Sequence, residues 1–388
     1  SLKYYYKAVK HSKENQNNKL LADSYLNMSN SYLRMGDSAF SLGYIRKAIQ
    51  NYKELNDTKG ITEAYLIIAH LYDRLGKQEK EREYLFKSLN LTSSYKVNPD
   101  TIARIYNSIG VSYANQSLLE EGLEYYHKSL DITEEYYLPN LQVLLSNNVG
   151  DIYRQKGEYD LALKYLHNAL MLLEEINNKE LECVVLYNIS IIYYKKEDFE
   201  LAIYFLRKGN KLTTKYNLAY AKTLIKGYRA YLNIKKGHIK KSLKDIKSCL
   251  DINQYIKFDP LQGLIYTALG LILEKKPYKE FPEKGKKLLE KVIAQINNID
   301  DKFNPESYFK KAIEKSSLPM LTDTHIPALY EYARFLYTNL RFNEAYEKFN
   351  EALKLSIKFG NYSERDTIIN IINELKLDMR TFCDNIKK

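Results

Sequence analysis

Histidine and carboxylate side chains could supply metal ligands or acid–base groups, and six histidines are scattered through the 388 residues. His127 and His167 stand one repeat period apart, and neighbouring repeats would separate them by about 10 Å, too far to share a metal ion. Adjacent glutamates such as Glu174 and Glu175 would point about 100° apart on a helix and cannot act as a pair. No HExxH, GxSxG or GxxxxGK[ST] motif occurs. We therefore expect a protein that is not an enzyme, with no catalytic residue, no metal site and no cofactor.

Cysteine usage favours a reducing compartment. Cys183, Cys249 and Cys383 are far apart and odd in number, and no CxxC or Cys/His cluster accompanies them. No apolar run approaches the roughly 18–20 residues of a membrane span, and no apolar stretch follows the basic first residues as in a signal peptide. The sequence predicts a cytoplasmic protein without a membrane partner.

The net charge of +11 is compatible with nucleic acid, an acidic partner or an anionic surface. However, the 48 acidic residues are interspersed with the 59 basic ones along nearly the whole chain. This mixing favours a solvated, lysine-rich exterior. Nucleic acid stays as the less favoured partner.

A repeat organises the chain. A small residue recurs, in five copies with a tyrosine three residues later, as at Gly150 and Tyr153, and a turn follows seven residues after the small residue, often at glycine as in Gly157. The small positions are Ser29, Ala69, Gly110, Gly150, Ser190, Ala230, Gly270 and Ala333, with spacings of 40, 41, 40, 40, 40, 40 and 63. Glycine in the turn supplies the positive φ that ends many helices. Each unit is thus predicted to be a helix, a tight turn and a second helix.

A second set of small residues lies on the second helix of each unit. In the clearest unit, which begins at Leu145, Ala162 and Ala169 are seven residues apart and share one helix face. Small residues there would let two helix backbones approach closely. Gly150, Tyr153, Gly157, Ala162 and Ala169 together resemble the tetratricopeptide repeat, and the 40-residue period resembles the long-period class found in bacterial signalling and regulatory proteins. Other helical solenoids share a period near 40 but lack this combination of residues.

The resemblance implies an all-α fold, a right-handed superhelical solenoid of antiparallel helix pairs. The register divides the chain into a partial repeat with only a second helix (1–20), seven helix pairs (21–300), an insertion (301–327), an eighth pair (328–360) and a closing helix (361–388). The start in mid-repeat fits a chain cut from a longer protein, or a lone N-terminal helix. In the seventh pair, Gly285 and Val292 are expected on the packing face of the second helix. The insertion, where Pro319 and Pro327 are expected to bound a loop, is either a tolerated surface segment or a contact element or hinge.

The resemblance also implies that the first helices line a concave groove that binds a ligand. Carried over by repeat position, the groove residues are His70, Arg74, Arg104, Asn107, Asn147, Asn148, Asp151, Arg154, Asn188 and Lys195, with Tyr228, Tyr231, Lys235 and Tyr330 in later units. A side-chain amide has both donors and an acceptor, which suits an extended peptide backbone. The alternative is that asparagine is merely frequent in this composition and solvated. The carboxylate-clamp pattern of chaperone-binding relatives is not reproduced cleanly.

These observations favour a non-catalytic scaffold that binds a peptide or protein segment, as the sensor or interaction region of a larger regulatory or signalling protein. Two alternatives remain. One is a basic solenoid associated with nucleic acid. The other is a peptide-pheromone-type regulator without its effector domain.

Overall fold

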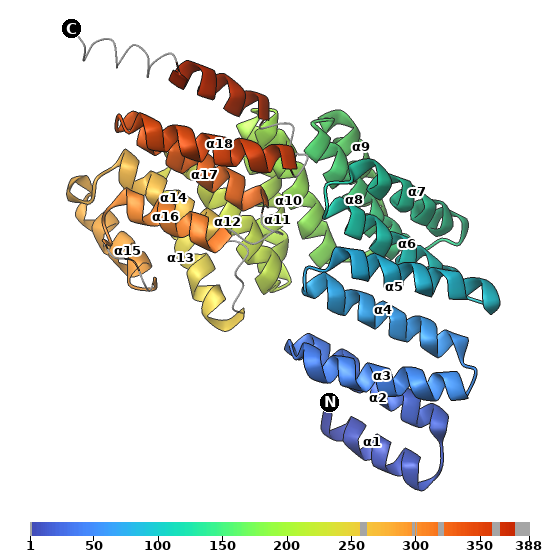
Figure 1. The fold of residues 1–388 in the computed structure, drawn as a ribbon. Coiled ribbons are helices and arrows are strands. Elements are labelled where there is room, and N and C mark those ends of the chain that lie inside the picture. Colours follow the sequence, from blue (N-terminus) through green and yellow to red (C-terminus); the bar gives the residue numbers. More distant parts are fainter. Residues whose placement is uncertain are drawn as a thin grey trace. The chain divides into compact units, whose positions relative to one another are not determined.

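A computed structural model of the protein describes residues 2–256, 262–296, 299, 301–316, 322–358 and 365–376. Within these ranges the chain is helical apart from turns and loops, and no strand occurs. The chain divides into two compact units, Ser1–Asn148 (unit 1) and Val149–Lys388 (unit 2). The expected all-α class is thereby confirmed, and Figure 1 shows the helices in chain order.

The helix bounds follow the predicted repeat closely in unit 1. Unit 1 contains α1 (Leu2–Glu14), α2 (Asn18–Met35), α3 (Ser38–Glu54), α4 (Thr58–Arg74), α5 (Gln78–Leu91), a short 3-10 helix η1 (Thr92–Ser94), α6 (Pro99–Ala114) and α7 (Leu119–Glu135). Helix α8 (Pro139–Lys156) contains the division between the units. Helices α2, α4 and α6 each pack most extensively on the helix that follows, so this part of unit 1 is a series of helix hairpins. Helix α1 packs on α2.

Unit 2 continues the pairs and then departs from them. It contains α9 (Tyr159–Ile176), α10 (Lys179–Lys195), α11 (Phe199–Lys215), α12 (Ala219–Lys235), α13 (Ile239–Ile256), α14 (Gln262–Lys275), η2 (Tyr278–Glu280), α15 (Glu283–Ile293), α16 (Pro305–Ser316), α17 (Thr322–Thr338), α18 (Phe342–Lys358) and a helix over 365–376. Helices α10 and α11, α12 and α13, and α17 and α18 form hairpins. The 365–376 helix buries Ile368, Ile372 and Leu375, whereas 377–388, including Cys383, lies outside the described residues.

Helix starts and turns have local causes. The predicted turn glycines Gly36 and Gly157 have φ of +85° and +81°, and Glu197 takes the same left-handed region with φ of +62°. Carboxylate or amide side chains accept a hydrogen bond from a backbone N–H in the first turn of several helices. These capping residues are Asn17, Asp37, Asp57, Asn98, Asn178 and Asp198.

The small positions lie where first and second helices touch, as expected. A Cβ atom at Gly110 would stand 2.6 Å from the Tyr126 ring and 3.1 Å from the Gly122 carbonyl oxygen. At Gly150 it would stand 3.0 Å from Leu166 Cγ and 3.3 Å from the Ala162 carbonyl oxygen. Such contacts leave no room for a larger residue without displacement of the neighbouring helix.

The aromatic residue three positions later has a packing role. In five units it stacks on a ring twelve residues further on, in the second helix of the same hairpin. The pairs are Tyr32–Tyr44, Tyr72–Tyr84, Tyr113–Tyr125, Tyr153–Tyr165 and Tyr193–Phe205, with ring centroids 5.4–5.6 Å apart. Stacked rings of this kind add about 0.5–1.5 kcal/mol beyond the burial of their area.

Helix α14 pairs with α16 instead of α15, which differs from the sequence expectation. A Cβ atom at Gly270 would lie 2.8 Å from the Phe309 ring, and one at Gly263 would lie 2.6 Å from Ser316 Cβ. Helix α15 packs on α13, and although Val292 is buried, Gly285 faces only Phe281 and Pro282 beside its own helix. The glycine face of α14 therefore receives a helix from the segment expected to be an insertion.

The end of that segment also differs from the expected loop. Pro327 lies inside α17 rather than at the edge of a loop, and Pro319 lies outside the described residues. The division of the chain into domains stays a prediction.

A buried carboxyl group in unit 1 makes stability depend on pH. Glu81 of α5 is 5% exposed, and Ser112 Oγ donates a 2.7 Å hydrogen bond to it. Burial raises the pKa of Glu81 from 4.5 to about 7, against the lowering effect of the Ser112 bond and with a further rise from the Asp73 charge. Between these two values the folded state holds a proton that the unfolded state has lost. The contribution of Glu81 to stability is therefore fully present below pH 4.5 and is lost as pH rises to about 7.

Glu81→Gln should consequently stabilise the protein relative to wild type at pH 8, by about 2–3 kcal/mol, and much less at pH 5. Urea unfolding at both pH values measures the difference. Glu79→Gln, on an exposed position of the same helix, is the control and should change little at either pH. An equal effect of Glu81→Gln at pH 5 and pH 8 would contradict the prediction.

Candidate functional site

A pocket of about 250 Å³ lies within unit 2 and is the candidate functional site. Its walls come from the C-terminal ends of α10 and α12, the first residues of α9 and α11, the N-terminal half of α17 and the 365–376 helix. The lining residues are Tyr159, Tyr194, Lys195, Glu197, Phe199, Tyr231, Lys235, Ile326, Pro327, Tyr330, Glu331, Thr367 and Ile368. We call it the α12–α17 pocket.

The repeat itself places the first wall of the pocket. Lys195 and Lys235 stand five residues after the small positions Ser190 and Ala230, so successive first helices present a lysine at the same place. Tyr194 lies beside Lys195, and its ring meets that of Tyr231 edge-on with centroids 6.0 Å apart. This wall therefore combines tyrosine rings with the ammonium groups of two lysines.

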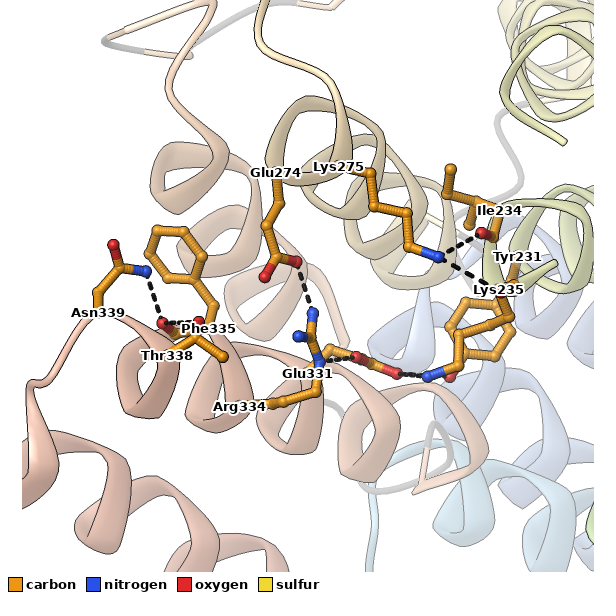
Figure 2. A network of polar contacts seen from close by, with 10 residues as sticks. All are labelled: Tyr231, Ile234, Lys235, Glu274, Lys275, Glu331, Arg334, Phe335, Thr338 and Asn339. Carbon is orange, nitrogen blue, oxygen red and sulfur yellow. Dashed lines mark hydrogen bonds and ion pairs between the residues drawn. The ribbon is translucent and has the colours of Figure 1, made fainter. Parts of the chain in front are cut away.

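Figure 2 shows the polar network on the opposite wall, centred on Glu331 of α17. The carboxylate is fully buried, and its Oε1 accepts hydrogen bonds from Lys235 Nζ at 2.7 Å and from the Tyr231 hydroxyl at 3.1 Å. Its Oε2 accepts from Arg334 Nε at 3.0 Å. These bonds join α12 directly to α17, although helices α13 to α16 lie between them in the chain.

Further contacts extend the network to α14. Arg334 Nη2 donates to Glu274 at 2.5 Å, and Lys275 Nζ donates to the carbonyl oxygen of Ile234 at 3.0 Å. Lys275 is thus held at the C-terminal end of α12, where unpaired carbonyl groups attract a cation. The network consequently ties together three helices, α12, α14 and α17.

At the centre of the network, Glu331 is ionised and Tyr231 is neutral. Burial alone would raise the pKa of Glu331, but Lys235 and Arg334 hold it below its ordinary value. Burial, with the charge of Glu331 among the further causes, raises the pKa of Tyr231 well above its ordinary value, so the phenol keeps its proton. Glu331 is therefore an anion that neighbouring groups already satisfy.

In unit 1, some of the predicted groove residues are exposed to solvent, whereas others are buried or bonded to the protein itself. Asn148 Nδ2 donates a 3.0 Å hydrogen bond to Asn107 Oδ1, so two of the predicted groove residues contact each other. Asn147, the third predicted asparagine of this unit, is buried. Arg104 is exposed and pairs with Asp100 at 2.7 Å. Two further candidates lie on α4. His70 is exposed, and Arg74 donates to the Leu33 carbonyl oxygen.

In unit 2, two of the predicted groove residues, Asp151 and Arg154, form an ion pair with each other. Arg154 is 3% exposed and donates to Asp151 through Nε at 2.9 Å and Nη2 at 2.6 Å. Asn188 is half-buried on α10, the helix that ends with Lys195. Of the predicted groove residues in this unit, the pocket brings together Lys195, Tyr231, Lys235 and Tyr330.

The sequence also held a signal for Glu331. It stands two residues before the small position Ala333, as Asn148 and Asn188 do before Gly150 and Ser190. Tyr194 likewise occupies a groove position, four residues after Ser190. By contrast, the contributions of Tyr159, Phe199 and Thr367 depend on how helices far apart in the chain approach one another.

The described part of the chain has neither a metal-binding cluster nor a membrane-spanning helix. No group of three or more His, Cys, Asp or Glu side chains there could hold a metal ion. No helix there is long and apolar enough to cross a membrane.

Comparison with known proteins identifies the repeats. Models of the tetratricopeptide repeat match residues 62–95, 102–140 and 141–209. No curated protein matches the chain.

Similar solved structures share the fold. A Rap protein complexed with competence and sporulation factor is 12% identical, with 92% of this chain and 97% of that chain covered and a TM-score of 0.58. The apo form of the quorum sensor NprR from B. thuringiensis is 15% identical, with 91% and 97% covered and a TM-score of 0.57. The Rap conjugation gene regulator of plasmid pLS20, in complex with the Phr* peptide, is 15% identical, with 79% of each chain covered and a TM-score of 0.50. At such identities the likeness shows a common helical-pair solenoid.

Proposed function

Because this chain belongs to the tetratricopeptide-repeat family, we propose that it is a non-catalytic scaffold that binds a peptide or protein segment. The α12–α17 pocket carries the proposal. Its walls combine aromatic rings with a few fixed polar groups, which is the usual composition of a binding site. Tyrosine, the commonest residue in these walls, gives a large contact area at a low cost in side-chain entropy.

The amide pair of unit 1 supports the same function independently. Asn148 and Asn107 form one hydrogen bond with each other, and each side-chain amide can make several. The backbone of an extended segment presents N–H and C=O groups that such amides can pair with. Since Asn147 is buried, the unit 1 site rests on Asn107 and Asn148, with Arg104 beside them on α6.

Two of the similar structures contain a bound factor or peptide, the Rap protein with competence and sporulation factor and the Rap regulator with the Phr* peptide. Their likeness in fold supports the choice of a peptide as the ligand class. A role as the sensor or interaction region of a larger regulatory protein fits this ligand class and is part of the proposal.

The test selects random displayed peptides on the whole chain and measures the affinity of the selected peptides by calorimetry. Thr367 lies exposed at the pocket, so Thr367→Trp fills the opening without removing a buried partner. We expect this change to raise the Kd at least about tenfold. Asn370→Trp, on an exposed position of the same helix that does not line the pocket, should leave the Kd unchanged.

Two results would count against the proposal. If no selected peptide binds with a Kd below about 100 μM, peptide binding is not the function. If selected peptides bind Thr367→Trp as tightly as wild type, the pocket is not the site, and Asn107 and Asn148 become the positions to change.

A further inference from the structure

The size of the α12–α17 pocket limits what can enter it. Its volume of about 250 Å³ is below the roughly 300–1,000 Å³ of sites that enclose a whole small molecule. A bound segment can therefore place one side chain in the pocket while its main chain stays at the opening.

Hydrogen-bonding capacity is unequal between Glu331 and Lys235, the two charged residues bonded to each other at the pocket. Glu331 is fully buried, and both of its oxygens already accept bonds from protein donors. Lys235 is 27% exposed, and its bond to Glu331 uses one of three ammonium hydrogens. A group that enters as far as Lys235 therefore meets an available donor, so an acceptor fits that position.

The local charge points the same way. Two lysines, Lys195 and Lys235, line the pocket, and the buried Glu331 is already bonded by Lys235 and Arg334. A negatively charged acceptor at Lys235 would form a charge-assisted bond with its ammonium group, and such a bond is stronger than a neutral one.

The walls specify the rest of the side chain. The rings of Tyr194, Tyr231 and Tyr330 and the side chain of Ile326 line the pocket together with Lys235, so a flexible methylene stem that enters it would meet apolar surface. Because Lys235 is mostly buried, a carboxylate at the end of a side chain reaches it, whereas one attached to the main chain would stop at the opening. Glutamate combines such a stem with such a carboxylate.

We propose that the α12–α17 pocket receives one glutamate side chain of the bound segment, with its carboxylate at Lys235 and Lys195. The inference rests on the proposed function and adds the chemistry that selects the segment. Arg104 and Arg154, which the sequence indicated for this role, do not line the pocket, whereas Lys195 and Lys235 do.

The test uses two pools of synthetic pentapeptides, capped at both ends, with glutamate or glutamine fixed at the middle and uncharged residues elsewhere. Glutamine has the shape of glutamate without its charge. Binding of the full chain to each pool is measured at low salt, and wild type should prefer the glutamate pool about tenfold. Lys195→Met should reduce that preference below about threefold, whereas Lys196→Met should preserve it, since Lys196 pairs with Asp160 and does not line the pocket.

Lys235→Met is a second variant. Because Lys235 also neutralises the buried Glu331, this change can destabilise the fold. Its folding is checked by circular dichroism, and Lys195→Met decides the outcome if it unfolds. Equal binding of both pools to wild type would overturn the glutamate inference and leave peptide binding intact. A Lys195→Met variant that weakens both pools equally and keeps the preference would also overturn it. Failure of both pools, with displayed peptides still selected, would overturn the inference alone.

Discussion

Replacing Arg334 by methionine should lower the free energy of unfolding by about 3–5 kcal/mol, because it removes one of the two cations that neutralise a buried carboxylate. Glu331 is 0% exposed, and Arg334 bonds to both Glu331 and Glu274. Methionine retains much of the packing of the arginine stem, so the loss reports mainly on the charge. Urea unfolding followed by circular dichroism measures the effect.

A second substitution separates charge from packing. Adding Glu331→Gln to Arg334→Met removes the charge left without its partner and should restore more than about 1 kcal/mol. Arg104→Met is the matched control, because its pair with Asp100 is exposed and should contribute less than about 1 kcal/mol. A double variant less stable than Arg334→Met would show that the network acts through shape and not through charge.

The repeat made the hairpins of this protein predictable. Gly110 and Gly150 lie at close helix contacts, and Tyr153 and Tyr193 stack within their hairpins, because these positions depend on residues at most about twenty apart. Local interactions of this kind repeat with the sequence and can be read from one unit.

The candidate site depends on longer distances and was only partly predictable. The groove positions indicated Lys195, Lys235 and Tyr330, but not that Glu331 would reach Lys235 from 96 residues away. They also pointed to Arg154, which is held by Asp151 within the same helix. A repeat position fixes the direction of a side chain, whereas its partner depends on which helices approach, and that depends on the break in the repeat after α14.

That break yields the last prediction. If the predicted insertion 301–327 were only a tolerated surface segment, replacing its first part, 301–316, by a short linker would leave stability nearly intact, since loop closure varies slowly with length. In the structure, Tyr308 and Phe309 of α16 are fully buried, and Phe309 fills the space beside Gly270. Phe309→Ala should therefore lower the free energy of unfolding by about 3–5 kcal/mol, through lost burial and the cavity left behind.

Phe303→Ala is the matched control within the same segment. Phe303 is 41% exposed and contacts Tyr278 alone among the ring pairs of the described residues, so its removal should cost about 1 kcal/mol or less. Replacing residues 301–316 by a linker should also broaden or split the urea transition of the full chain, because the glycine face of α14 would lose its covering helix. Similar small losses for Phe309→Ala and Phe303→Ala, with a single sharp transition after the linker replacement, would show that α16 is dispensable and that the segment is an insertion after all.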